Sequence, residues 1–115
     1  MINLHKKRFW EDLSTLDFSN ANTENFLAIL PIAAVEQHGP HLPVGVDSKI
    51  VDGIVKIISK ELPEKSNAIF LPTFKIGKSN EHSKFPGTLS FSAQTLFSSL
   101  LDIGECVCSA GTKKL

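Results

Sequence analysis

The sequence predicts an α/β fold on a parallel sheet, because short continuous apolar runs alternate with longer runs of helical periodicity. The first apolar run, residues 26–32, has no polar alternation, which is typical of a strand covered on both faces. A second short apolar run, residues 68–71, ends at Pro72. We expect these two runs to be neighbouring strands.

An amphipathic helix is expected after each strand. Over residues 48–62 apolar side chains recur every three or four positions, and Pro63 ends the pattern. Asp47 precedes this run, where an N-cap residue would stand. The second helix is expected to begin at Ser92 and to end near Gly111.

The predicted order is therefore β-α-β-α, and residues 113–115 resemble the start of a third strand. A chain of 115 residues suits one small domain, but a two-stranded parallel sheet is a poor place to end a fold. We expect residues 1–115 to be the amino-terminal part of a single larger domain. Cys106 and Cys108 point to nearly opposite sides of the second helix, which favours buried packing over a disulfide or a metal site.

Charge and hydropathy exclude several classes of partner. The 12 basic and 12 acidic residues give no net charge, so no long-range field would attract nucleic acid or an anionic membrane. The longest apolar run, residues 26–35, is interrupted by Pro31 and is shorter than the ~20 residues that span a bilayer. The basic residues 6–8 are not followed by the apolar stretch of a secretory signal. The sequence thus predicts a cytoplasmic protein.

Three side chains of metal-binding type follow the first strand. In an extended segment Glu36 and His38, two residues apart, project from the same face. Asp47 returns through a segment that Pro40 and Pro43 stiffen. A mixed nitrogen and oxygen set suits zinc, manganese or iron, and parallel sheets bind ligands beyond the carboxyl ends of their strands. Glu36, His38 and Asp47 are therefore the predicted metal ligands.

The same residues have simpler interpretations. Asp47 could cap the following helix, which is compatible with metal binding because a cap uses only part of a carboxylate's acceptor capacity. Glu36 could be solvated or paired with a lysine. His38 could hydrogen-bond a backbone carbonyl.

Further polar residues lie near the predicted site. Glu81 and His82 follow the second strand, within a polar loop over residues 77–87. One interpretation is that they line a substrate pocket or hydrogen-bond a metal-binding residue from behind. The other is that they belong to an ordinary surface loop. His41, inside the first motif, has the same two interpretations as Glu81 and His82, a pocket or supporting residue or an ordinary loop residue, and it is assigned no metal.

Two motifs resemble those of the creatininase (creatinine amidohydrolase) family. The first is EQHGPHLP, residues 36–43, followed by Asp47, and the second is GKSNEHSKFPGTL, residues 77–89. The resemblance implies an αβα sandwich on a mostly parallel sheet, of which this chain holds the first β-α-β-α portion. It also implies homo-oligomers, often hexamers, with two divalent metals in each complete subunit. By motif position Glu36 binds one metal, His38 binds the other, and Asp47 bridges them.

The implied activity is the hydrolysis of a non-peptide C–N bond in a small cyclic amide or formamide, by water that the metals activate. A later family block that carries another metal-binding histidine is absent from residues 1–115, so we expect this chain alone to be inactive or incomplete. The alternative is a non-catalytic remnant that acts through metal binding or oligomeric association. A nucleotide-binding fold is disfavoured, since no glycine-rich phosphate motif follows the first strand.

Overall fold

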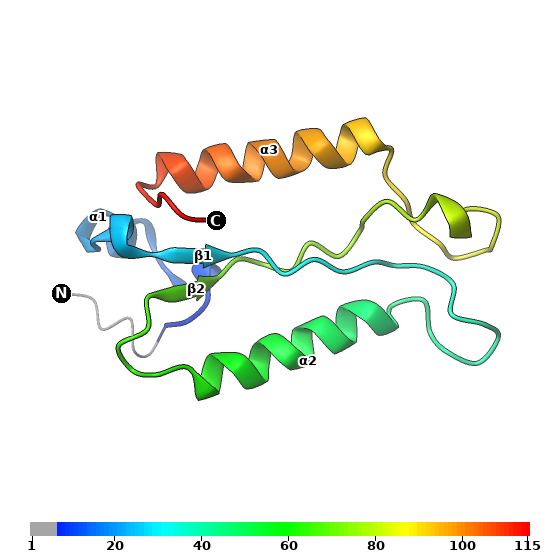
Figure 1. Ribbon diagram of the computed structural model, residues 1–115, viewed down its shortest axis with the longest axis horizontal. Coiled ribbons are helices and arrows are strands. Elements are labelled where there is room, and N and C mark those ends of the chain that lie inside the picture. The colour runs from blue at the N-terminus through cyan, green and yellow to red at the C-terminus, as the bar shows by residue number, and fades with distance from the viewer. Residues whose placement is uncertain (1–6) are drawn as a thin grey trace.

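The computed structural model describes residues 7–115 and has three layers. Strands β1 (Leu27–Ile29) and β2 (Ala68–Phe70) form the middle layer, with helix α2 (Val46–Glu61) on one side and helix α3 (Ala93–Ser109) on the other (Figure 1). The predicted αβα arrangement is confirmed. A short helix α1 (Thr15–Asn20) and three 3-10 turns complete the described elements: Trp10–Asp12, Thr23–Asn25 and Asn80–His82.

The two strands are parallel, and backbone hydrogen bonds continue the sheet on both sides. Ala28 of β1 is opposite Ile69 of β2. Beyond β2, the Phe70 N–H donates to the carbonyl of Arg8 at 2.8 Å. Beyond β1, the Ala28 N–H donates to the carbonyl of Lys114 at 3.0 Å. Residues 113–115 therefore begin to pair with β1, as the sequence predicts, although no strand is assigned to them.

Both strands are shorter than the apolar runs that predict them. β1 ends at Ile29 rather than at residue 32, because Pro31 has no N–H to donate to a ladder. Parallel pairing resumes between Ile32 and Phe74, and the Phe74 N–H donates to the carbonyl of Pro31 at 2.8 Å. The extended segments after β1 and β2 thus run together toward the loops (Figure 1).

The core lies between the sheet and α3. Phe26, Ala28, Ile69 and Leu71 pack there against Val107. From α3 only Val107 is buried, with Ile103 partly buried one turn earlier. The predicted burial of Cys106 and Cys108 is wrong: both are free and exposed, because they flank the narrow stripe of α3 that faces the sheet.

Helix α2 covers the other face of the sheet, and its boundaries differ slightly from the prediction. It begins two residues earlier than expected, so its N-cap is Gly45, and the prediction of Asp47 as N-cap is wrong. Asp47 lies instead in the first turn. No helix in residues 7–115 is long and apolar enough to cross a membrane.

Candidate metal centre

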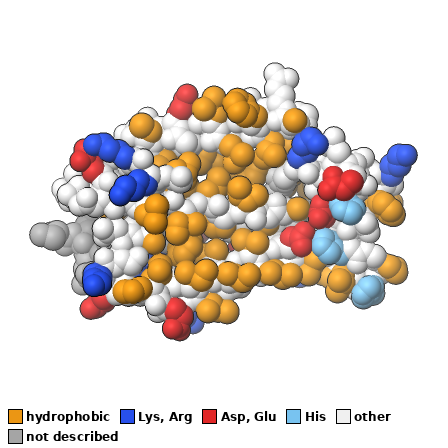
Figure 2. All heavy atoms as spheres, viewed as in Figure 1, with side chains coloured by type: hydrophobic (Ala, Val, Ile, Leu, Met, Phe, Trp, Pro, Cys, Tyr) orange, Lys and Arg blue, Asp and Glu red, His pale blue; other side chains and the backbone are white. Residues whose placement is uncertain are grey.

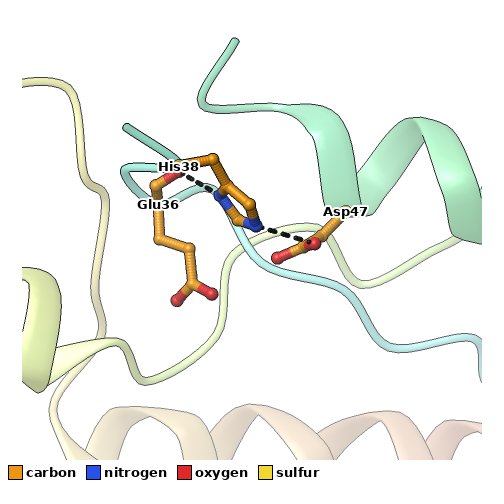
Figure 3. A group of neighbouring side chains, drawn as sticks. All are labelled: Glu36, His38 and Asp47. Carbon is orange, nitrogen blue, oxygen red and sulfur yellow. Dashed lines mark hydrogen bonds and ion pairs between the residues drawn. The ribbon is translucent and has the colours of Figure 1, made fainter. Parts of the chain in front are cut away.

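The three predicted ligands come together where the first motif turns back into α2. Glu36, His38 and Asp47 each offer one ligand atom, and these atoms lie within 4.8 Å of one another (Figure 3). All three side chains are partly buried. A metal-binding role therefore needs no rearrangement of the backbone.

Backbone hydrogen bonds close the loop that brings Asp47 back. The Glu36 N–H donates to the carbonyl of Val44 at 3.0 Å, and the Val46 N–H donates to that of Pro43 at 3.2 Å. Gly39 turns the chain with a φ of +77°, which glycine adopts at little cost. The prolines and glycines of the motif predict a loop that leads back to Glu36. Hydrogen bonds between the two ends of the loop close it.

His38 is held by both ring nitrogens. Its Nδ1 lies 2.9 Å from the backbone carbonyl of Glu36, and its Nε2 lies 3.2 Å from Asp47 Oδ1. A carbonyl only accepts, so Nδ1 carries a proton and Nε2 is the atom that can bind a metal. The hydrogen bond to the Glu36 carbonyl raises the pKa of His38; burial opposes this, and the nearby carboxylates of Asp47 and Glu36 reinforce it. Below that pKa a proton occupies the position at Nε2 that a metal would take.

The start of α2 fixes Asp47. The helix dipole favours a carboxylate in the first turn, where unpaired N–H groups point outward. Next to it, the buried Ser48 donates its hydroxyl to the carbonyl of Ala34 at 3.3 Å. The first turn of α2 is thereby tied to the same extended segment that carries Glu36 and His38.

The second motif lies against the first. The Leu89 N–H donates to the carbonyl of Val35 at 2.9 Å, which pairs the two segments in antiparallel fashion. As a result, Glu81 and His82 form a second group with Glu36, again with ligand atoms within 4.8 Å of one another. Their proximity to the predicted metal ligands is thus present in the structure. Figure 2 shows acidic and histidine side chains gathered at this end of the molecule.

Two residues of the site, Gln37 and Thr88, were not anticipated from the sequence. Gln37 Nε2 lies 2.9 Å from His82 Nδ1, and the Gln37 N–H donates to Thr88 Oγ1 at 3.1 Å. The available signal was the alternation of an extended segment, which directs Gln37 away from the face shared by its two neighbours. Its partners, about 50 positions further along the chain, gave no such signal.

His41 belongs to neither group of potential ligands among the described residues. It is exposed, and its ring lies close to Gly39, where an added Cβ would stand 3.6 Å from it. The structure therefore places His41 beside the turn of the loop.

The donor set fits a divalent transition metal. It offers one imidazole nitrogen and the oxygens of two carboxylates, a combination suited to zinc, manganese or iron. The hydrogen bond at His38 Nδ1 directs Nε2 toward Asp47, and a backbone carbonyl behind a ligand histidine is the usual support for metal binding.

Comparison with known proteins finds matches to one family. The family model described as creatininase, creatinine amidohydrolase, matches residues 11–115. The chain is 32% identical over 81 residues to a protein named mycofactocin precursor peptide peptidase from Mycolicibacterium smegmatis, covering 69% of this chain and 33% of that protein. It is 30% identical over 92 residues to creatinine amidohydrolase from Pseudomonas putida, covering 76% of this chain and 34% of that protein.

Solved structures show the same fold. A mutant creatininase complexed with creatine superposes with a TM-score of 0.80 at 25% identity, covering 96% of this chain and 43% of that one. A mutant creatininase described as Zn-Zn type gives a TM-score of 0.79, with the same identity and coverage. The chain spans about a third of the length of the curated relatives it matches.

Proposed function

The chain belongs to the creatininase family, and we propose that its first motif forms part of a divalent-metal centre for the hydrolysis of a C–N bond in a small amide. The observation that carries the proposal is the convergence of Glu36, His38 and Asp47 within 4.8 Å. A family match alone would not require these side chains to meet, and their geometry supports the assignment independently.

The three side chains have different parts in this proposal. Glu36 would bind one ion, His38 would bind the other through Nε2, and Asp47 would bridge the two, as the family motif implies. When bound, such ions lower the pKa of a water molecule and polarise the carbonyl of the substrate. The carboxylates of Glu36 and Asp47 balance the charge of the ions, and the Glu36 carbonyl holds the ring of His38 in its binding orientation.

Three side chains leave several coordination positions of two ions to other groups. We therefore propose that residues 1–115 fold as the amino-terminal part of a creatininase-like domain. Alone, they would bind one ion or bind weakly, with little turnover. That this chain covers 43% of the solved creatininase chain supports the proposal.

For the substrate, we propose a small cyclic amide or a formamide. The similarity to a creatinine amidohydrolase supports the cyclic amide. The similarity to a precursor peptide peptidase supports a peptide-derived amide as the competing class. The residues that would choose between these classes are expected outside the two motifs.

A second candidate function, association without catalysis, is favoured by one observation. Helix α2 presents a row of isoleucines to solvent, with Ile50, Ile54 and Ile57 at least half exposed. Figure 2 shows further hydrophobic side chains over the middle of the molecule, between its two long helices. Such a surface is typical of an interface, so we propose a homo-oligomer in which α2 is covered.

Metal analysis of the purified chain, together with an amidase assay, tests the proposed function. We expect zinc, manganese or iron at no more than one tightly held ion per chain, and little hydrolysis of creatinine or of a formamide. Asp47→Asn should lose the metal, whereas Asp102→Asn, a matched change on α3, should keep it. Equal metal content in the two variants would contradict the assignment. Two tightly held ions with ordinary turnover would contradict the proposed incompleteness.

A further inference from the structure

We propose that His82 is a positioning residue for Glu36, and that Gln37 fixes the tautomer in which His82 acts. In this arrangement His82 carries its proton on Nε2, on the side that faces the Glu36 carboxylate, and does not itself bind metal. The role of His82 rests on the proposed metal centre. The tautomer does not, because hydrogen bonds within the chain determine it.

The orientation of the Gln37 amide is set by the backbone. The Gly39 N–H lies 3.0 Å from Gln37 Oε1. A backbone N–H can only donate, so the atom facing it must be the amide oxygen. The amide nitrogen of Gln37 then necessarily points the other way, toward His82 Nδ1, 2.9 Å from it.

That contact decides where His82 carries its proton. An amide NH₂ group only donates, so His82 Nδ1 must accept and has no hydrogen of its own. The proton of the neutral ring is therefore on Nε2, which lies 3.9 Å from Glu36 Oε2. This distance is longer than a hydrogen bond, so the pair is an electrostatic contact between an N–H and a carboxylate. With the side chains of His82 and Glu36 only 28% and 18% exposed, water screens it weakly.

His82 and His38 differ in the groups that their ring nitrogens face. Glu36, Glu81 and His82 are close enough together to suggest a second metal site. Binding through His82 Nε2 would move the ring proton to Nδ1 and set it against the donor group of Gln37. His38 is arranged differently, because its Nδ1 faces a carbonyl and its Nε2 faces the Asp47 carboxylate, so a metal bound at Nε2 would leave the Nδ1 hydrogen bond in place.

The segments that carry these side chains are held in register by further hydrogen bonds. Thr88 Oγ1 accepts from the Gln37 N–H at 3.1 Å, and the carbonyl of Ser79 accepts from the His82 N–H at 3.0 Å. His82 therefore approaches Glu36 from a fixed backbone, as a group that orients a ligand should.

Nitrogen-15 NMR of the metal-free chain tests the tautomer directly. The spectrum is recorded over a series of pH values, and the tautomer is assigned where the two ring nitrogen shifts show a neutral imidazole. We expect His82 with its proton on Nε2. In Gln37→Glu the new carboxylate can only accept, so the proton should move to Nδ1. Gln94→Glu, the same change on the exposed start of α3, should leave His82 as in the wild type. A wild-type ring protonated on Nδ1, or no response to Gln37→Glu, would overturn the proposal.

Zinc affinity, measured by competition with a chelator, tests the positioning role. His82→Ala should weaken zinc binding roughly 10- to 100-fold, as expected when a group behind a ligand is lost. His82→Gln, which can place an N–H near the position of Nε2, should stay within a few-fold of the wild type and covers the case in which the alanine variant fails to fold. Equal losses in the two variants would show that His82 binds the metal and would overturn the proposal, as would unchanged affinity in a folded His82→Ala. If the wild type itself binds no zinc, the proposed function fails while the tautomer result stands.

Discussion

At the scale of single residues, the first motif could be predicted because its geometry is local. Glu36 and His38 share a face of one extended segment, and Asp47 returns to them through a short loop whose prolines and glycines can be recognised in the sequence. Gln37 could not be assigned in this way, since its partner His82 is 45 positions away in the sequence. Contacts of that kind depend on how two loops pack, which spacing does not encode.

A residue-scale prediction concerns Asp17, whose pKa falls from 3.8 to about 2 because Lys7 donates a hydrogen bond to it and the N–H and hydroxyl of Ser14 support its charged form. A lowered folded-state pKa contributes stability above the unfolded value, and this contribution is lost as the pH falls from about 4 to about 2. Urea denaturation at a series of pH values should show this loss in the wild type and not in Asp17→Asn. Parallel stability curves for the two proteins would contradict the assignment.

At the scale of elements, the helices were predicted better than the strands. Helical periodicity placed both long helices within two residues of their observed ends, since it averages over many side chains. The strands are three residues each, because ladder pairing depends on partners that an apolar run does not specify. The predicted N-cap of α2 was wrong for a related reason. Asp47 has a cap-forming side chain, but the helix begins after Gly45, two residues earlier.

At two glycines, substitution by alanine is predicted to change the stability of the fold in opposite directions. Gly111 ends α3 with a φ of +92°, and an added Cβ would stand 2.5 Å from Thr23 Oγ1, so Gly111→Ala should destabilise the fold by more than about 1 kcal/mol. Gly53 lies inside α2 with open space around it, so Gly53→Ala should stabilise the fold by about 0.5–1 kcal/mol. Thermal or urea denaturation of both variants checks the pair. A shift in the same direction for both would contradict this interpretation of their surroundings.

At the scale of the whole molecule, the layer order followed from the sequence, and the open surfaces did not. Alternating apolar runs and amphipathic helices predicted helices on both faces of a parallel sheet. The same periodicity in α2 could not tell which of its isoleucines would be covered within residues 7–115, and several remain exposed. Periodicity marks an apolar face and does not specify how much of that face the neighbouring sheet covers.

The exposed face of α2 leads to a prediction about assembly. If copies of the chain associate through it, the wild type should be larger than a monomer by light scattering, and Ile54→Lys should shift it toward the monomer because a charge would be buried at the contact. Glu61→Gln, which changes the net charge by the same amount at the end of α2, should have no effect. A monomeric wild type, or an unchanged Ile54→Lys, would exclude association through this face.

The central claim is that the first motif binds metal through one imidazole nitrogen and the carboxylates beside it. A crystal structure of the chain grown with zinc, measured at the zinc absorption edge, tests it most directly. We predict an anomalous peak within about 2.0–2.2 Å of His38 Nε2 and of a carboxylate oxygen of Asp47, or of Glu36 and Asp47 together. A peak bound by His82 and Glu81 instead, or no peak near Asp47, would contradict the account.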